Sequence, residues 1–203
     1  MSGNGLEVLL SEGIKNRLRK ENIMTRNKMK LVLLVSILLM GLTGTLGWAS
    51  NSLQEKIDER TTVIWIEGTA LGDMVIGSRA QAAFVYVDGT LSHAVASDPN
   101  APEWLKWHSN HYSDKKLKNR ALFIMRYKAI KRWSFSPEMI RIGEYKVTGD
   151  DILTSKDFMA VGELPPDSTG TLAFSVPAKY VPKGRNILIS LGDFSGELNV
   201  PKR

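Results

Sequence analysis

The feature that most constrains this sequence is a run of 24 residues without a formal charge, from Leu31 to Gln54. Its first ten residues, 31–40, are almost entirely apolar, and a helix of about 20 apolar residues is long enough to cross the hydrocarbon layer of a membrane. Three of the five residues before the run are basic, whereas acidic residues begin again at Glu55. Because basic flanks stay on the cytoplasmic side, the sequence predicts a cytoplasmic N-terminus and an extracytoplasmic remainder, in the periplasm or at the cell surface.

Two interpretations of this run stay open, a cleaved signal peptide and an uncleaved membrane anchor. Gly47-Trp48-Ala49 places small residues at the two positions that a signal peptidase reads, which favours cleavage after Ala49. Residues 24–49 are therefore predicted to be a signal peptide for secretion or a single-pass anchor, which would contact the membrane through residues 31–54.

Residues 1–23 form a long polar segment before the predicted signal peptide or anchor. Met24 begins a basic segment that would be a complete start of a signal peptide by itself. The codons for Lys20-Glu21, just before Met24, can form a purine-rich ribosome-binding sequence. The sequence therefore predicts translation from Met24, with residues 1–23 as untranslated leader. The alternative is a short cytoplasmic tail on an anchored protein.

Residues 50–203 are long enough for one domain with a full hydrophobic core. They carry 20 basic and 18 acidic residues, so most of the chain's net charge of +6 lies ahead of residue 50. Cysteine is absent, which excludes disulfides, thiol catalysis and thiolate metal sites. The polar segment 50–61, with Leu53 and Ile57 at helical spacing, is interpreted as a tether with a short helical stub, and 62–203 as the extracytoplasmic domain.

Runs of β-branched and aromatic residues predict strands along this domain. Thr62–Ile66 is the first such run. Ala82–Val87 and Thr90–Val95 predict a β-hairpin, because Asp88-Gly89 between two alternating runs is a strong turn signal. The segment Glu103–Arg120 is predicted to be a loop with one or two helical turns.

Ala121–Trp133 alternates in polarity, with Phe123, Met125, Tyr127 and Ala129 on one face, which predicts a strand rather than a helix. Further short strands separated by turns are predicted at 139–142, 145–147, 170–177, 186–191 and 197–200. Without a long amphipathic helix, these strands predict an all-β fold, mainly an antiparallel sandwich. Six residues are predicted to be buried in it: Phe84, Tyr86, Phe123, Phe174, Val176 and Leu188.

Two stretches, Phe135–Ile142 and Gly162–Pro177, resemble the telokin-like, immunoglobulin-like domains that many bacteria export. Such domains carry an F-x-P step, a Pro-Gly turn and a Gly-x-hydrophobic-x-Phe-x-Val-Pro strand, and Asp167 stands where the Gly of the turn is expected. The resemblance covers about residues 121–191. It implies an immunoglobulin-like fold and an extracytoplasmic location, and it supplies no catalytic residues.

Motifs of metalloproteases, phosphate-binding loops and nucleophile elbows are absent from the sequence. The chain has three histidines. His108 and His111, three residues apart, would meet on one face of a helical turn, where His93 or Asp114 would complete a zinc or copper site. Surface histidines in a polar loop are the alternative, and no cofactor is predicted.

The main compositional anomaly is Lys106–Arg132, which holds nine basic residues and the single acid Asp114, interleaved with aromatic residues. Such a segment would bind an anionic partner, such as lipid headgroups, a wall polymer or an acidic protein, whereas nucleic acid lies in another compartment. One alternative is a solvated sheet face over core tryptophans; another is that Trp104 and Trp107 stack on sugar rings. The candidate binding residues are Trp104, Trp107, Lys115, Lys116, Lys118 and Arg120.

The sequence therefore predicts a non-catalytic binding or assembly module of the bacterial cell envelope. The alternative is an envelope-polymer (carbohydrate) binding protein or hydrolase, whose carboxylates would be dispersed through the fold. The two classes differ in shape, because an enzyme needs a deep cleft with converging polar groups, whereas a binding module can present a flat or edge surface.

Overall fold

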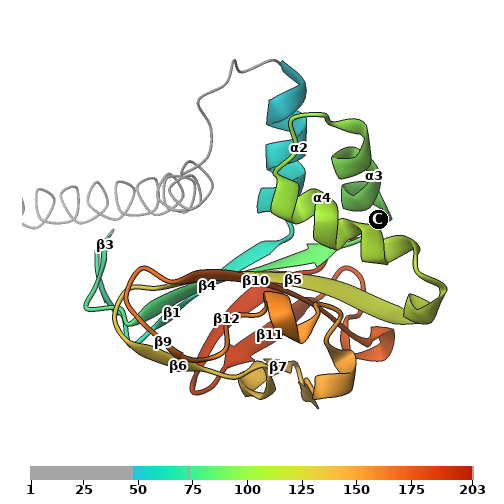
Figure 1. The fold of residues 1–203 in the computed structure, drawn as a ribbon. Coiled ribbons are helices and arrows are strands. Elements are labelled where there is room, and N and C mark those ends of the chain that lie inside the picture. The colour runs from blue at the N-terminus through green and yellow to red at the C-terminus, as the bar shows by residue number, and fades with distance from the viewer. Residues whose placement is uncertain (1–47, 73, 203) are drawn as a thin grey trace, which may run out of the picture. The chain divides into compact units, whose positions relative to one another are not determined.

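A four-stranded antiparallel sheet in the order β1-β4-β5-β10 lies at the centre of the fold (Figure 1). Its strands are β1 (Thr61–Ile66), β4 (Ala80–Val87), β5 (Arg120–Ala129) and β10 (Thr169–Pro177). Successive side chains of a strand point to opposite faces. In β5 both faces are buried, with Phe123 and Met125 on one face and Leu122 and Ile124 on the other. The strand predicted within 121–133 is therefore confirmed, although its second face is buried as well.

The computed structural model describes residues 48–72 and 74–202. The predicted leader or cytoplasmic tail, 1–23, and residues 24–47 of the predicted signal or anchor lie outside the described residues. Within the described part, no helix combines the length and the apolarity needed to span a membrane.

A second antiparallel sheet, in the order β12-β11-β7-β8, shares a core with the central sheet. Its strands are β7 (Ile140–Ile142), β8 (Tyr145–Lys146), β11 (Asn186–Leu191) and β12 (Phe194–Asn199). Phe123 and Phe174 of the central sheet and Ile189 of β11 are members of this one cluster of buried residues. The domain is thus mostly β with antiparallel sheets, and the strands predicted in the final third are confirmed.

The prediction that Leu188 is buried is wrong. Ile187, Ile189 and Leu191 of β11 turn into the core, whereas Leu188 turns outward and is 49% exposed. Apolar residues occupy both faces of this strand, so its composition does not distinguish the inward face from the outward one. The other five predicted core residues are buried: Phe84, Tyr86, Phe123, Phe174 and Val176.

Two short strand pairs and several single turns complete the β part of the domain. β2 (Thr69–Leu71) pairs with β3 (Met74–Ile76), and β6 (Trp133–Phe135) pairs with β9 (Gly162–Leu164). Short 3-10 turns join other elements: η2 (Asn110–Ser113), η3 (Lys115–Leu117), η4 (Pro137–Met139), η5 (Gly149–Asp151), η6 (Lys156–Phe158) and η7 (Ala178–Tyr180).

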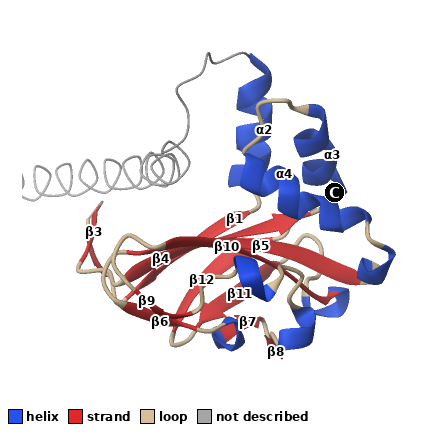
Figure 2. Ribbon diagram, viewed as in Figure 1, coloured by secondary structure: helices blue, strands red, loops and turns tan. Residues whose placement is uncertain are grey.

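Three helices lie over the remaining face of the central sheet (Figure 2): α2 (Trp48–Asp58), α3 (Gly89–Ser97) and α4 (Glu103–Ser109). Leu53 and Ile57, one turn apart on α2, are 6% and 1% exposed, and α2 contacts α3. The segment 50–61, predicted to be a tether, is therefore mainly a packed helix of the domain, because this apolar pair gives it a buried face. The uncharged run 31–54 ends inside α2, and the predicted cleavage position after Ala49 lies in its first turn.

The β-hairpin predicted around Asp88-Gly89 is wrong, because Asp88 begins helix α3 instead. One oxygen of the Asp88 carboxylate accepts a hydrogen bond from the backbone N of Leu91 at 2.8 Å, as an N-cap residue does. The other oxygen lies 3.0 Å from Nε and from Nη2 of Arg60, and both side chains are buried. Leu91 and Val95, one helical turn apart, are also buried. Capping, the ion pair and this apolar pair together outweigh the local turn preference of Asp-Gly.

Candidate functional site

Helix α4 positions the aromatic residues of the predicted binding segment. Pro102 precedes the helix, and Glu103 lies in its first turn, where an acid interacts favourably with the helix dipole. Leu105 and His108, three residues apart, are buried and attach the helix to the domain. Trp107 lies between these two inward residues on the outer side of the helix and is 54% exposed.

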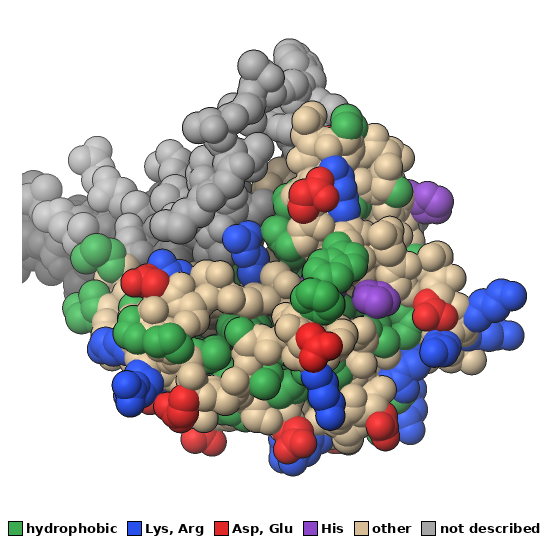
Figure 3. Space-filling view, viewed as in Figure 1, with side chains coloured by type: hydrophobic (Ala, Val, Ile, Leu, Met, Phe, Trp, Pro, Cys, Tyr) green, Lys and Arg blue, Asp and Glu red, His purple; other side chains and the backbone are tan. Residues whose placement is uncertain are grey.

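Four residues form what we call the aromatic patch: Trp107, His108, His111 and Phe158. The Trp107 ring stacks on His108 with centroids 5.3 Å apart and planes at 17°, and it meets the edge of Phe158 at 5.4 Å. His108 and His111 stack in turn at 6.4 Å. Phe158, from η6, is 63% exposed, so the patch presents two large rings to solvent. The space-filling view shows hydrophobic side chains gathered beside a histidine on this face (Figure 3).

His108 attaches the aromatic patch to the central sheet. The residue is 2% exposed, and its Nε2 lies 3.0 Å from the Thr171 hydroxyl of β10. Within the described residues its Nδ1 is buried without a hydrogen-bond partner. Burial lowers the pKa of His108, and the neighbouring His111 lowers it further. The ring is therefore neutral at physiological pH and gives Trp107 a fixed, uncharged support.

Three exposed lysines, Lys115, Lys116 and Lys118, follow the aromatic patch along the chain, and we call them the lysine segment. Asp114 begins η3 by accepting a hydrogen bond from the backbone N of Lys116 at 2.9 Å. No ion pair of the described residues includes any of the three lysines. Figure 3 shows Lys and Arg side chains projecting at an edge of the same face.

Arg120 belongs to an internal network rather than to this surface. Its Nη2 contacts Asp151, and its Nε donates to the Ser175 hydroxyl at 2.8 Å. Asp151 is 4% exposed and also accepts hydrogen bonds from the Tyr145 hydroxyl and from the backbone N and hydroxyl of Thr148. Burial alone would raise the pKa of Asp151, but these hydrogen bonds outweigh it and hold the pKa below its usual value. Arg120 is thus a structural residue, and its partner Asp151, 31 positions later, is not predictable from residue spacing.

The other basic residues of the segment 104–132 are distributed over the sheet. Trp104 is half-buried beneath Arg126, whose guanidinium carbon lies 5.4 Å from the ring centroid. Lys131 and Arg132 follow the C-terminal end of β5, whereas the lysine segment precedes its N-terminal end. The ten residues of β5 span about 33 Å. The predicted segment therefore divides into two separate basic surfaces.

The three histidines do not form a metal site. His93 is exposed on α3, whereas His108 is buried and contacts Thr171. In the part of the chain that the structure describes, no group of three or more His, Cys, Asp or Glu side chains is placed to hold a metal ion. The predicted zinc or copper site of His93, His108 and His111 therefore receives no support from the geometry.

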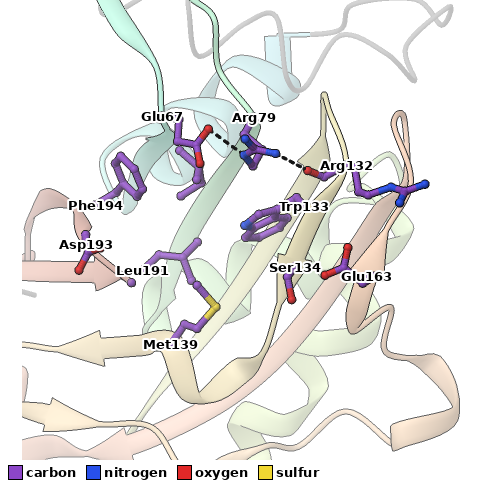
Figure 4. Close-up of a pocket in the computed structure, with 12 residues that line it drawn as sticks. Glu67, Arg79, Arg132, Trp133, Ser134, Met139, Glu163, Leu191, Asp193 and Phe194 are labelled. Atoms are coloured by element: carbon purple, nitrogen blue, oxygen red, sulfur yellow. Dashed lines mark hydrogen bonds and ion pairs between the residues drawn. The ribbon is translucent and has the colours of Figure 1, made fainter.

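A pocket of about 400 Å³ lies where β1 ends and β4 begins (Figure 4). Arg79 lines one edge of it, with Nε 2.7 Å from a Glu67 carboxylate oxygen and Nη1 donating to the Arg132 carbonyl at 2.8 Å. Trp133, which is buried, contributes to its wall. Three exposed carboxylates from separate segments also line it: Glu67, Glu163 and Asp193. A general acid is usually prepared by burial, so this pocket does not favour the hydrolase alternative.

Comparisons of the chain with models of protein families, with curated proteins and with solved structures found no match. Fold and surface therefore define a class and not a family. This class is a mostly β domain whose central sheet is covered by short helices on one face. It presents the exposed aromatic patch beside β10, where His108 contacts Thr171, and the lysine segment before the N-terminal end of β5.

Proposed function

We propose that this chain is a non-catalytic binding module of the cell envelope, which works outside the cytoplasmic membrane and binds an anionic glycan. The observation that carries the proposal is the exposure of Trp107. Its ring is held on buried His108, yet 54% of the residue's surface stays open to solvent. Large aromatic groups exposed together usually mark an interaction site, and a ring held in one orientation loses little conformational entropy on binding.

The lysine segment indicates that the ligand is negatively charged. Exposed rings alone would suit a neutral sugar chain, and lysines alone would suit any polyanion. Trp107, His108 and His111 of the aromatic patch and the lysine segment follow one another along the chain from α4 through η2 to η3, which favours a polymer that carries both sugar rings and negative groups. Charges on an exposed surface act mainly on association and are screened over about 8 Å at physiological salt.

The location and the finer fold class are parts of the same proposal. Support for an extracytoplasmic location is the apolar run behind a basic flank in the sequence. Support for an immunoglobulin-like sandwich is the pair of four-stranded antiparallel sheets around one core. Helices α3 and α4, between β4 and β5, are additions to such a sandwich.

The proposed location predicts the behaviour of reporter fusions at Arg203. An alkaline phosphatase fused there is expected to be active, because that enzyme acquires its disulfides only outside the reducing cytoplasm. A reporter that works only in the cytoplasm is expected to be silent at the same position. Deletion of residues 31–47 should reverse both results. Activity of the cytoplasmic reporter on the intact chain would exclude the location.

The proposed binding surface predicts a loss of affinity on replacement of Trp107. Trp107→Ala in the full chain, purified in detergent, is expected to weaken binding of polygalacturonate about tenfold, because one lost aromatic contact of about 1.4 kcal/mol corresponds to that factor. Lys115, Lys116 and Lys118 replaced together by Ala should also weaken binding and flatten its salt dependence. Isothermal titration calorimetry at two salt concentrations measures both effects.

A matched control removes the same charge elsewhere. Triple replacement of Lys183, Arg185 and Lys202, which are exposed, should leave binding unchanged. Dextran, which lacks charge, and polyphosphate, which lacks sugar rings, should both bind less tightly than polygalacturonate. Equal binding before and after replacement of the lysine segment would contradict the proposal, and so would an unchanged affinity of the Trp107 variant.

A further inference from the structure

The β2–β3 hairpin carries an apolar face that the fold leaves uncovered. Leu71 pairs with Met74, and Thr69 pairs with Ile76, and directly opposed residues of two strands point to the same side. Leu71, Met74 and Ile76 are 54%, 65% and 45% exposed. Three large aliphatic side chains thus share one exposed face within six residues of sequence. Figure 1 shows the hairpin projecting from the end of the central sheet.

The hairpin is held at its base. Arg79 pairs with Glu67 at 2.7 Å, and these residues flank the hairpin on its two sides in the sequence. The Lys131 side chain donates a hydrogen bond to the Gly77 carbonyl at 2.9 Å, which ties the end of β3 to the residues after β5. A two-stranded hairpin is marginally stable alone. These contacts therefore help to keep the apolar face in its projecting position.

Basic side chains and one more apolar residue adjoin this base. The backbone N atoms of Ile130 and Lys131 donate to the Arg79 carbonyl at 2.8 and 2.9 Å, and Ile130 is 41% exposed. Lysine and arginine side chains at the base of the hairpin can reach lipid headgroups while the apolar side chains of the hairpin enter the boundary of the acyl chains. The charge here is nevertheless mixed, because the pocket carboxylates lie at the same end and the sequence places Asp73, outside the described residues, between β2 and β3. The apolar face, and not net charge, is the main argument.

We propose that Leu71, Met74 and Ile76 insert into the interface of a lipid bilayer and orient the domain on the membrane. The inference rests on the extracytoplasmic location proposed above and on the uncleaved-anchor interpretation of residues 24–49, and not on glycan binding. A stable protein interface needs about 800 Å² on each partner, far more than three side chains supply. A bilayer accepts a smaller apolar area when an anchor already holds the domain nearby at high effective concentration.

The strand register gives this orientation a consequence for the binding surface. Ala80 of β4 pairs with Ala129 at the hairpin end of the sheet, and Val87 pairs with Leu122 near the lysine segment. The hairpin and the lysine segment therefore lie at opposite ends of β5. With the hairpin in the bilayer, the lysine segment would lie at the end of β5 that is away from the membrane.

The test uses single-cysteine labels in the full chain, which has no cysteine of its own. Met74→Cys and, as matched control, Leu188→Cys, which replaces another exposed aliphatic residue, each receive an environment-sensitive nitrobenzoxadiazole label. The protein is then reconstituted into vesicles of phosphatidylcholine with phosphatidylglycerol. The label at 74 is expected to shift its emission to shorter wavelength and to be quenched by brominated acyl chains, whereas the label at 188 should remain water-like.

A second variant separates insertion from mere proximity. Leu71→Ser together with Ile76→Ser, in the chain labelled at 74, is expected to abolish the shift without changing the melting temperature, because both residues are exposed. Three results would overturn the proposal: a label at 74 that stays water-like on vesicles, equal shifts at 74 and 188, or a shift without vesicles that grows with protein concentration. The last result would indicate a second copy of the chain as the partner. Glycan affinity plays no part in these readouts.

Discussion

Replacement of Asp88 by Asn is expected to lower the free energy of unfolding by about 3 kcal/mol, since it leaves a buried guanidinium without its main counter-charge. The Arg60 and Asp88 side chains are 4% and 9% exposed. Asn can keep the oxygen that caps α3 at the backbone N of Leu91, so the substitution separates the ion pair from the cap. The contacts of Arg60 Nη1 with Glu59 and with the Lys56 carbonyl remain, which places the loss at the low end for a buried pair. Urea unfolding followed by circular dichroism measures it.

Two further variants serve as controls for this prediction. Glu67→Gln breaks the ion pair with Arg79, in which the Glu67 and Arg79 side chains are 48% and 39% exposed. This substitution should lower the free energy of unfolding by less than about 1 kcal/mol. Asp88→Ala removes the cap as well and should cost about 1 kcal/mol more than Asp88→Asn. If Asp88→Asn were no more harmful than Glu67→Gln, the buried pair would not be what holds α3 to the domain.

Replacement of Phe174 by Ala is expected to cost about 3–5 kcal/mol, through lost transfer free energy and the cavity that remains. Phe174 is 0% exposed. Its ring stacks on Phe123 with centroids 5.6 Å apart, and it meets the edge of Phe84 at 6.4 Å. All three rings belong to the core that the two sheets share, where neighbours cannot easily collapse into the space. Urea unfolding at constant pH measures the loss.

Leu188→Ala provides the contrast for the Phe174 variant. Leu188 is also on a strand of the domain, but its side chain is 49% exposed, so its replacement should change stability by about 0.5 kcal/mol or less. A similar loss of stability at the two positions would mean that β11 turns its other face to the core.

The sequence alone was sufficient for most of the strands. In β5 the alternation that places Phe123 and Met125 on one face reports the period of a strand directly. Turn residues between short apolar runs likewise predicted β7, β8 and β11, because such signals are local and need no partner elsewhere in the chain. The same local reasoning identified Trp107 and the lysine segment as candidates for a surface, and both are exposed.

Long-range pairing decided the points at which local reasoning was wrong. Asp88-Gly89 has the composition of a hairpin turn, but Arg60, 28 positions earlier, supplies the charge that Asp88 needs as the first residue of α3. Arg120 looks like one more surface cation until the fold brings Asp151 and Ser175 to it. No spacing rule in the sequence predicts partners at such separations.

The sequence by itself determined where apolar and polar residues alternate, and therefore the strands and the mostly β class. Only the tertiary structure decided which apolar residues are inside, because a strand with apolar residues on both faces, such as β11, is oriented by its neighbours. It also decided which charges stay at the surface. The nine basic residues of Lys106–Arg132 are close together in the sequence but separated in space, because β5 places the two ends of the segment about 33 Å apart. Burial and distance are properties of the packed sheets, and they are not contained in any local stretch of the chain.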